Sequence, residues 1–390
     1  MNYHLMIDDK FFDSLIDDIE KVTLPGHNRY LIRGDKNDPT YVIHEKAEWI
    51  GNIYDLTFTN LIESFTTKDR IFIYWYDIHI GKLMLTIPKE IPLYVAVTGG
   101  DFYDDPPLYH RNLLYDKLTL RYVNRRYIYP PKWARRPQKL AKQMWEIYNK
   151  KRKLRIDFKL KANTVRRINY LLIGDFMFDE LSIIRKLYQA RYFHHLPFIY
   201  NQNFDLALTF EKNLKNTATV NIQVGNSATD TNNHVDILKH LKHFAKEDIK
   251  IVLPLAYGDE DYGQFVKKSY KSVFADKATF QNEFVTRENY LKKLNEIDVC
   301  IMNHNRSQAL GNCITILAMG KKLYLKENNP LWSMFKQIGV KIFSADTIKN
   351  ISFDEFKQAL KPEQAQSNIE KLSTSFSEKK RLEYLSNLLN

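Results

Sequence analysis

Polar segments that follow apolar runs carry the side chains most suited to binding a phosphate or a sugar. In residues 224–234, Gly225 permits close backbone approach, and Asn226 and Ser227 supply hydrogen-bonding groups. A helical pattern follows directly, and the N-terminus of a helix favours an anion. The segment therefore predicts a cradle for a diphosphate, with an ordinary polar turn and helix cap as the alternative. It matches neither the G-x-G-x-x-G nor the Walker pattern.

A second polar segment, residues 300–312, has the same context of apolar run, polar loop and helical pattern. Arg306 offers a planar fork of donors for a phosphate, and Gln308 can bind carbonyl or hydroxyl groups. Six polar residues directly after a buried strand favour a binding loop over a solvated one. The candidate ligand-binding residues of this segment are Asn303, His304, Arg306, Gln308, Gly311 and Asn312. A histidine such as His304 is more often a structural hydrogen-bonding group than a catalyst.

Weaker candidates lie between these segments. The ring of Tyr257 can stack on a base, and a carboxylate such as Glu283 is the usual partner of ribose hydroxyls, although either residue can be simple surface. Residues 259–261, Asp-Glu-Asp, match a D-x-D metal motif with hard oxygen ligands. An acidic first turn of a helix explains the same residues. We favour that interpretation and predict neither a metal nor a cofactor.

In the N-terminal half, two glycines follow a buried apolar run and precede Asp101. Glycines at this point open a space at the edge of a sheet, into which Asp101 would project its carboxylate. A carboxylate there can orient or deprotonate an acceptor hydroxyl, which makes Asp101 the candidate catalytic residue. The alternative is a tight turn with solvated acids.

The elements that must position these residues alternate along most of the chain. Apolar stretches of strand length are followed by amphipathic helical patterns, which is typical of parallel α/β architecture. In the N-terminal half, strands are predicted at residues 3–7, 29–32, 41–44, 70–75, 93–98 and 168–173. In the C-terminal half, they are predicted at residues 219–224, 250–253, 297–302, 321–325 and 340–343. We expect two doubly wound domains that face a cleft, joined by a linker at residues 194–203.

Length and composition agree with two globular domains. The chain has 390 residues, of which 44% are hydrophobic and 27% charged, so a largely disordered chain is excluded. Its two cysteines form no C-x-x-C pair, which argues against a disulfide framework and a structural zinc site. No stretch approaches the roughly 18 apolar residues of a membrane span, and the N-terminus lacks the pattern of a signal peptide.

The net charge of +12 is concentrated in one segment. Residues 117–167 contain 18 basic and 2 acidic residues, which leaves a net charge of about −4 for the rest of the chain. Interleaved aromatic residues favour an anionic membrane surface. Nucleic acid is the alternative partner for such a segment. The candidate membrane-contact residues are Arg125, Arg126, Trp133, Arg135, Arg136, Lys150, Lys151, Arg152 and Lys153.

Several of these motifs together resemble one family. They are residues 225–227 with 232–234, residues 253–255 with Tyr257 and Gly258, residues 303–312, and residues 99–103, with a looser likeness over 167–174. The chain resembles the TDP-N-acetylfucosamine:lipid II N-acetylfucosaminyltransferases, which are 4-alpha-L-fucosyltransferase-type enzymes of surface polysaccharide assembly. Ala309 departs from the glycine that the family often has, and the segment 129–161 is longer and more basic.

The resemblance implies a GT-B glycosyltransferase, with two Rossmann-like domains, on the cytoplasmic face of the inner membrane. Its domains would be an acceptor-side domain of residues 1–198, with a basic insertion at about 117–167, and a nucleotide-sugar-binding domain of residues 199–390 with a terminal helix at 363–390. The enzyme would be peripheral, retaining and independent of metal, with Arg306 and helix N-termini neutralising the leaving diphosphate. It would move 4-acetamido-4,6-dideoxygalactose (Fuc4NAc) from a TDP-sugar donor to a polyprenyl-diphosphate-linked saccharide acceptor.

Other functions remain open at this point. A transferase with a UDP-sugar donor and a different glycan acceptor would use the same residues. A nucleic-acid-binding α/β protein would use the basic segment as its interface, although we expect no nucleic acid partner. A noncatalytic partner in a polysaccharide assembly is a third possibility.

Overall fold

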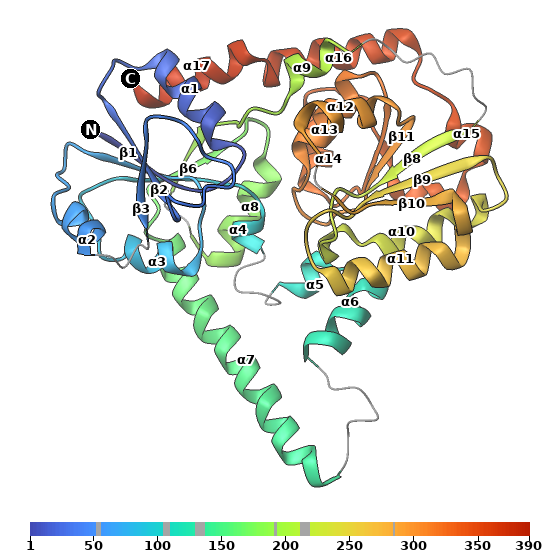
Figure 1. Cartoon of the computed structure of the whole chain (residues 1–390), viewed down its shortest axis with the longest axis horizontal. Helices are drawn as coiled ribbons and strands as arrows, with labels where there is room; N and C mark the ends of the chain where they lie inside the picture. The colour runs from blue at the N-terminus through green and yellow to red at the C-terminus, as the bar shows by residue number, and fades with distance from the viewer. Residues whose placement is uncertain (52–55, 104–109, 129–136, 191–192, 211–218, 284) are drawn as a thin grey trace. The chain divides into compact units, whose positions relative to one another are not determined.

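The computed structural model describes residues 1–51, 56–103, 110–128, 137–190, 193–210, 219–283 and 285–390 (Figure 1). These residues form two compact units, each built on one parallel sheet. The first unit comprises Met1–His110, Lys150–Asn201 and Ser375–Asn390, and the second comprises Arg111–Asn149 and Gln202–Thr374. Parallel sheets are covered by helices on both faces, which is why their strands are largely apolar.

The sheet of the first unit has the strand order β3-β2-β1-β4-β5-β6-β7, and every pair is parallel. Its strands are β1 (Asn2–Ile7), β2 (Asn28–Arg33), β3 (Ala47–Gly51), β4 (Arg70–Ile73), β5 (Leu93–Ala96), β6 (Tyr170–Ile173) and β7 (His194–Pro197). Its helices are α1 (Phe12–Val22), α2 (Leu56–Glu63), α3 (Ile78–Met84), α4 (Gly100–Tyr103), α8 (Phe178–Tyr188) and α17 (Glu378–Leu389).

The sheet of the second unit has the order β10-β9-β8-β11-β12-β13 and is also parallel throughout. Its strands are β8 (Val220–Val224), β9 (Ile249–Pro254), β10 (Ala278–Gln281), β11 (Val299–Met302), β12 (Lys322–Leu325) and β13 (Phe343–Ser344). Its helices are α5 (Arg111–Leu114), α6 (Lys117–Val123), α9 (Phe204–Leu208), α10 (His234–Leu241), α11 (Glu260–Phe274), α12 (Arg287–Asn295), α13 (Leu310–Ala318), α14 (Pro330–Gln337), α15 (Phe353–Lys357) and α16 (Pro362–Phe376).

Both sheets have a topological switch point, at which successive strands begin to be added on the other side of the first strand. In the first sheet β1 lies between β2 and β4, and in the second sheet β8 lies between β9 and β11. At such a switch point the loops after the two strands turn to opposite sides and leave a crevice for a ligand. In the second unit the switch point lies between β8 and β11, so the loops that follow Val224 and Met302, two of the segments singled out from the sequence, are where such a site is expected.

The strand predictions are confirmed in the sheet interiors and wrong at the edges. Residues 41–44 form a loop, in which the backbone N–H groups of Thr40, Tyr41 and Val42 donate to the Asp8 carboxylate. Strands β7 and β10 were not predicted, and β7 lies within the expected linker. With β3 they form three of the four sheet edges, where strands are half-exposed and their apolar signal is weak.

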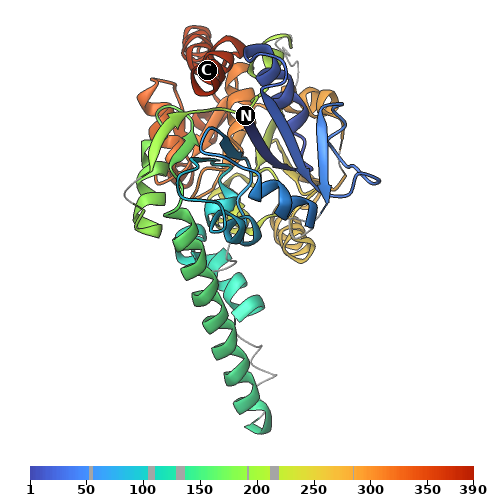
Figure 2. The same ribbon diagram turned by 90° about the vertical axis from the view of Figure 1, so that its left-hand side faces the viewer.

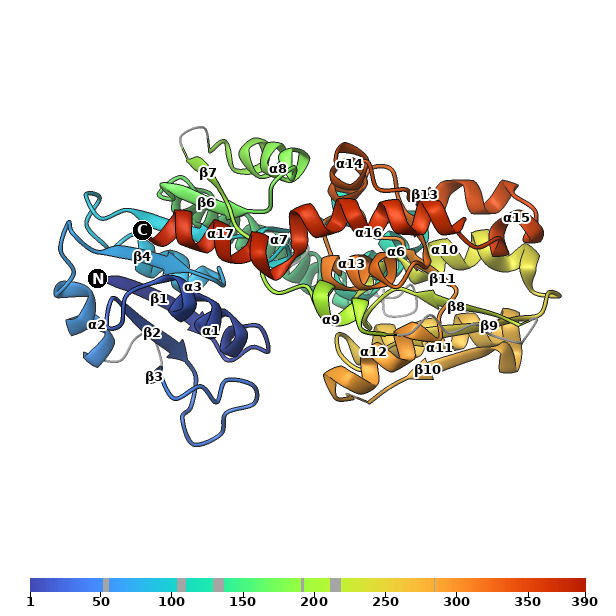
Figure 3. The ribbon, with the colours of Figure 1, turned by 90° about the horizontal axis from the view of Figure 1, so that it is seen from above.

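The compact units differ from the predicted domains of residues 1–198 and 199–390 in three places, the smallest being that the first unit extends to Asn201. Residues 111–149 of the basic insertion belong to the second unit, and α17 belongs to the first. Helix α17 packs against α1 (Figure 3), and Leu385, Leu388 and Leu389 join the core of the first sheet. The terminal helix predicted over residues 363–390 is therefore two helices, with Ser377 capping the second.

Helix α7 (Pro137–Val165) is one continuous helix that contributes to both units (Figure 2). Its end is buried in the first unit, where the Lys161 side chain is fully buried among the rings of Tyr76, Phe102 and Tyr188. The Lys161 ammonium lies 5.0 Å from the centroid of Tyr76 and donates to the main-chain carbonyl of Asp101. These contacts anchor the helix at its C-terminal end.

A buried ion pair anchors α17 to α1. Arg381 Nε donates to Asp18 Oδ2 over 2.6 Å, and only 5% and 4% of the two side chains are exposed. Removing one partner leaves a buried charge without compensation. We expect Arg381→Ala to lower the free energy of unfolding of the first unit by about 3 kcal/mol, measured by urea unfolding followed by circular dichroism.

The neighbouring pair of Lys21 and Glu378 is the matched control, because it joins the same two helices but is half-exposed. Glu378→Gln should cost less than about 1 kcal/mol. The double substitution Asp18→Leu with Arg381→Met should recover part of the loss. Equal losses for Arg381→Ala and Glu378→Gln would contradict this account of how α17 is held.

Candidate functional site

The loop after β8 passes so close to two side chains that only glycine fits at its start. Gly225 has φ of +70°, and a Cβ atom there would lie 2.5 Å from His234 Nε2 and 2.6 Å from Asn232 Oδ1. Its N–H still donates to the Ile301 carbonyl over 2.9 Å, which continues the pairing of β8 with β11. Glycine is therefore required here because two side chains of the same unit pack against its backbone.

The buried side chain of Asn232 joins this loop to the loop after β11. Its Oδ1 accepts from the Asn226 N–H over 2.9 Å and lies 2.8 Å from His304 Nε2, while its Nδ2 donates to Ser227 Oγ over 3.2 Å. Burial, with the charge of Arg306, holds the pKa of His304 well below its usual value, so the ring is neutral. Because Asn232 Oδ1 can only accept, His304 carries its proton on Nε2.

A second bridge between the two loops runs through Gln308. Its Nε2 donates to Asn226 Oδ1 and to Thr229 Oγ1, each over 3.1 Å, and its Oε1 accepts from Thr231 Oγ1 over 2.7 Å. Asn226 Nδ2 in turn donates to the Tyr257 hydroxyl over 2.8 Å. The structure therefore brings Asn226, Gln308 and Tyr257, all candidates from the sequence, into one hydrogen-bonded group.

The loop after β9 is fixed to the same group by its backbone. Ala228 N donates to the Tyr257 carbonyl over 2.7 Å, and Asp259 N donates to the Ala228 carbonyl over 3.0 Å. Gly258 has φ of +116°, and a Cβ atom there would lie 2.6 Å from the backbone of Ala228. This bridge holds the ring of Tyr257 with 42% of its surface exposed.

The remaining candidates of the second segment lie at the start of α13. Arg306 is buried, and its guanidinium donates to the Ser307 carbonyl over 3.1 Å. Gly311 and Asn312 are half-buried in the first turn. Ala309 has φ of +58°, a left-handed conformation that glycine adopts without strain. That conformation explains why glycine is expected at this position.

Two sequence candidates lie away from this group. Glu283 is exposed and follows β10, which is separated from the switch point by β9. Asp101 lies in the first unit and is 2% exposed, and its Oδ2 accepts from the Thr98 N–H over 3.3 Å. Its carboxylate is buried beneath the loop after β5, where we expected it to project from that loop.

The D-x-D residues form the start of a helix, as we favoured. Asp259 Oδ1 accepts from Tyr262 N over 2.7 Å and caps α11. The guanidinium of Arg126, a candidate membrane-contact residue, bridges the carboxylates of Asp259 and Asp261. Among the described residues, no three His, Cys, Asp or Glu side chains gather as a metal site would require.

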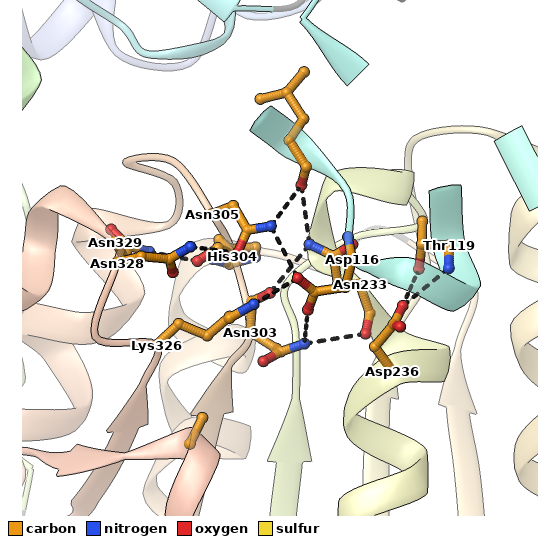
Figure 4. A network of polar contacts seen from close by, with 12 residues as sticks. Asp116, Thr119, Asn233, Asp236, Asn303, His304, Asn305, Lys326, Asn328 and Asn329 are labelled. Carbon is orange, nitrogen blue, oxygen red and sulfur yellow. Dashed lines mark hydrogen bonds and ion pairs between the residues drawn. The ribbon is translucent and has the colours of Figure 1, made fainter. Parts of the chain in front are cut away.

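Sequence reasoning missed a polar network at the carboxyl ends of β11 and β12 (Figure 4). Asp116 Oδ1 accepts from Lys326 Nζ over 2.6 Å and from Asn305 Nδ2 over 3.0 Å, and Asp116 Oδ2 accepts from Asn303 Nδ2 over 3.3 Å. Lys326 directly follows β12, and this strand-end position is the one signal that could have identified it. Asp116 resembles an ordinary helix cap in the sequence.

The basic candidates are described in part. Trp133, Arg135 and Arg136 lie outside the described residues. Arg125 is exposed, and so are Lys150, Lys151, Arg152 and Lys153 on α7. No helix in the described part of the chain combines the length and apolar character needed to cross a bilayer.

Solved structures share the two-unit architecture. A sucrose-phosphate synthase from Thermosynechococcus elongatus aligns over 100% of this chain and 98% of its own length, with a TM-score of 0.61 and 10% identity. A UDP-forming α,α-trehalose-phosphate synthase from Burkholderia xenovorans aligns over 99% and 97%, with a TM-score of 0.60 and 9% identity. At such identities the likeness concerns the fold, and it confirms the GT-B architecture expected from the resemblance.

The sequence itself matches a family of glycosyltransferases. The profile of the family described as "4-alpha-L-fucosyltransferase glycosyl transferase group 56" matches residues 136–384, which include every strand of the second sheet and both polar loops of the switch point. This confirms the family suspected from the motifs. The chain therefore belongs to the 4-alpha-L-fucosyltransferase family, glycosyl transferase group 56, and is a glycosyltransferase.

Proposed function

We propose that the protein transfers Fuc4NAc from a TDP-sugar to a polyprenyl-diphosphate-linked saccharide during surface polysaccharide biosynthesis. The observation that carries this proposal is the hydrogen-bonded group at the switch point of the second sheet. There, Asn226, Gln308 and Tyr257 come from three different strand-end loops and are held together by direct hydrogen bonds. Family membership supports transfer of a deoxy sugar.

In this proposal the donor diphosphate lies beside the loop after β8 and the start of α13. Arg306 is the fixed positive charge that stabilises the departing diphosphate, which is the role a metal has in other transferases. Ser227, Asn303, Gly311 and Asn312 complete the proposed donor site. In a retaining reaction at one face of the sugar, the departing phosphate oxygen accepts the proton of the acceptor hydroxyl. We propose that the reaction needs no metal.

The exposed ring of Tyr257 is the proposed stacking surface for the base. Its hydroxyl is held by Asn226, so the ring is oriented before a ligand arrives. Glu283 remains a candidate for the ribose hydroxyls only if the ligand extends to the loop after β10. His304, neutral and bonded to Asn232, supports the loop that carries Arg306.

Asp101 remains the proposed acceptor-side residue. Its buried carboxylate accepts from Thr98 N, and its carbonyl accepts from Lys161 of α7. Because the carboxylate is buried, it can reach an acceptor only after a local shift of the loop that contains Gly99 and Gly100. Asp101→Asn should then reduce transfer while leaving donor binding unchanged.

We propose that α7 places the enzyme on the cytoplasmic face of the inner membrane as a peripheral protein. Exposed residues recur at helical spacing along one face of α7, so that apolar, aromatic and basic groups share one stripe. This stripe consists of Met144, Trp145, Tyr148, Lys151, Arg152, Arg155, Ile156 and Lys159. Cations with aromatic groups beside them suit the headgroup region of an anionic leaflet.

A second candidate function uses UDP in place of TDP. It is supported by two similar structures, the UDP-forming synthase described above and an Escherichia coli trehalose-6-phosphate protein bound with UDP-2-fluoro glucose. The second structure aligns over 99% of this chain and 95% of its own length, with a TM-score of 0.52 and 10% identity. Both bases present a face for stacking on Tyr257, so binding measurements must separate the two candidates.

A thermal-shift titration with TDP, UDP and GDP tests the donor proposal. At 100 times its dissociation constant, TDP should stabilise the second unit by about 2.7 kcal/mol. The stabilisation should be the same with EDTA and with manganese, and Arg306→Ala should abolish it. Arg287→Ala, which changes an exposed arginine of the same unit, is the control and should respond like the unchanged protein.

Stronger stabilisation by UDP than by TDP would replace the proposed donor by the second candidate. If no nucleotide stabilises the protein, the donor site is not where we place it.

Binding to lipid vesicles tests the membrane proposal. Replacing the four basic residues of the stripe, Lys151, Arg152, Arg155 and Lys159, by glutamine should weaken sedimentation with anionic vesicles by about 100-fold or more, because each cation near such a surface contributes about 1 kcal/mol. The control replaces four exposed lysines of the second unit, Lys239, Lys242, Lys246 and Lys250, by glutamine. Equal weakening by both sets would show that net charge, and not α7, determines binding.

A further inference from the structure

The carboxylate of Asp116 lies in a group of donors that would suit a phosphate. Lys326 contributes an ammonium, and Asn303 and Asn305 contribute side-chain amides, so three N–H donors from two strand-end loops converge on one carboxylate (Figure 4). The residues are largely withdrawn from solvent, since Asn303, Asn305 and Lys326 are each less than 10% exposed. We call these three residues the amide–lysine cradle.

Asp116 is not needed as the capping residue of α6, although its position in the sequence suggests that role. It stands at the N-cap of α6, yet its side chain makes no capping hydrogen bond. Asp236 of α10 caps α6 instead, accepting from Leu118 N over 2.8 Å and from Thr119 N over 2.9 Å. With the helix satisfied by another residue, the Asp116 carboxylate is directed to Lys326.

The backbone around Asp116 is held on the same loops. Asp116 N donates to Asn233 Oδ1 over 2.8 Å, and Asn233 Nδ2 donates to the Leu114 carbonyl over 3.1 Å. Tyr115 donates its hydroxyl proton to Asp230 over 3.0 Å. The segment is therefore docked independently of the ion pair, and the carboxylate can change partner while its backbone stays in place.

The cradle shares Asn303 with the proposed donor site. Alternate side chains of the loop after β11 serve two groups: His304 and Gln308 bond toward the loop after β8, and Asn303 and Asn305 bond toward Asp116. Both groups lie at the carboxyl end of the second sheet. Lys326 adds a cation next to this edge whose charge is balanced by a carboxylate of the same chain.

We propose that the amide–lysine cradle is a phosphate subsite and that Asp116 is its resident anion. When a phosphate group of a substrate enters, Lys326 and the two amides bond to the phosphate oxygens in place of the Asp116 carboxylate. No covalent bond changes in this exchange. The inference rests on the proposed function only for the source of the phosphate, which is the TDP donor or the lipid-linked diphosphate.

The exchange and a purely structural role of Asp116 predict opposite changes in phosphate affinity when the charge of Asp116 is removed. A carboxylate next to the entering phosphate repels it and competes for Lys326, so removing its charge should strengthen phosphate binding. If Asp116 served only to position Lys326, removing its charge would weaken binding. The direction of the change in affinity therefore separates the two roles.

The test measures binding of inorganic pyrophosphate to the full chain by isothermal titration calorimetry. Asp116→Asn should bind it about tenfold more tightly than the unchanged protein, and Lys326→Gln about tenfold more weakly, as expected for changing one charge near a partly screened site. In the absence of ligand, Asp116→Asn should also lower the Tm, because Lys326 loses its counter-ion.

Asp236→Asn is the matched control, because it removes another carboxylate that holds the same segment but has no contact with the cradle. It should lower the Tm and leave pyrophosphate affinity unchanged. Unchanged or weaker binding by Asp116→Asn, or unchanged binding by Lys326→Gln, overturns the inference. Lys326→Gln decides alone if Asp116→Asn does not fold.

Two further ligands identify the source of the phosphate. TDP stands for the donor and farnesyl diphosphate for the lipid-linked diphosphate, with thymidine as the ligand without phosphate. The ligand whose affinity rises in Asp116→Asn occupies the cradle, and thymidine should bind equally to both proteins. If pyrophosphate responds as expected but TDP does not bind the unchanged protein, the cradle stands and the proposed donor fails.

Discussion

The candidate site depends on how the second sheet satisfies the polar groups at its switch point. Because β9 and β11 lie on opposite sides of β8, the loops after β8 and β11 turn apart, and their buried polar groups cannot pair by strand ladders. Asn232 and Gln308 supply the missing hydrogen bonds from side chains. Gly225 is required because these side chains approach its backbone so closely that no Cβ fits. The loops are thus held in a fixed arrangement before any ligand binds.

The same need to satisfy backbone groups explains where the second unit begins. The N–H groups at the start of α6 are paired with Asp236, a residue of α10 more than 100 positions along the chain. Arg126 adds a bridge to Asp259 and Asp261 beyond the end of α6. These charge-assisted contacts hold the segment that contains α6, from the N-terminal half of the chain, in the second unit. A boundary drawn from composition alone could not anticipate it, since each contact joins residues distant in sequence.

The sequence predicted what depends on local pattern. The central strand β11 is buried throughout and is a continuous apolar run, and β8 alternates apolar with polar residues as a strand does. The loops that follow both strands were correctly expected to be polar and to lie at strand ends. Edge strands β3, β7 and β10 were missed because half-exposed residues give no such run. The pairing of Asp116 with Lys326 was missed for a different reason. Its two residues are 210 positions apart, and Asp116 has the local signature of a helix cap that it does not form.

Helix α7 carries a buried basic residue near one end and exposed basic residues further along its length. Lys161 near its C-terminal end is buried against three aromatic rings, where cation–π contacts and the Asp101 carbonyl compensate for the loss of water. Some ten residues earlier, Lys150, Lys151, Arg152 and Lys153 are exposed. Because α7 is one continuous helix, fixing one part of it restricts the movement of the rest. A surface that holds the exposed stretch of α7 would therefore also constrain Lys161 and the main chain of Asp101, which ties the proposed membrane contact to the proposed acceptor side of the enzyme.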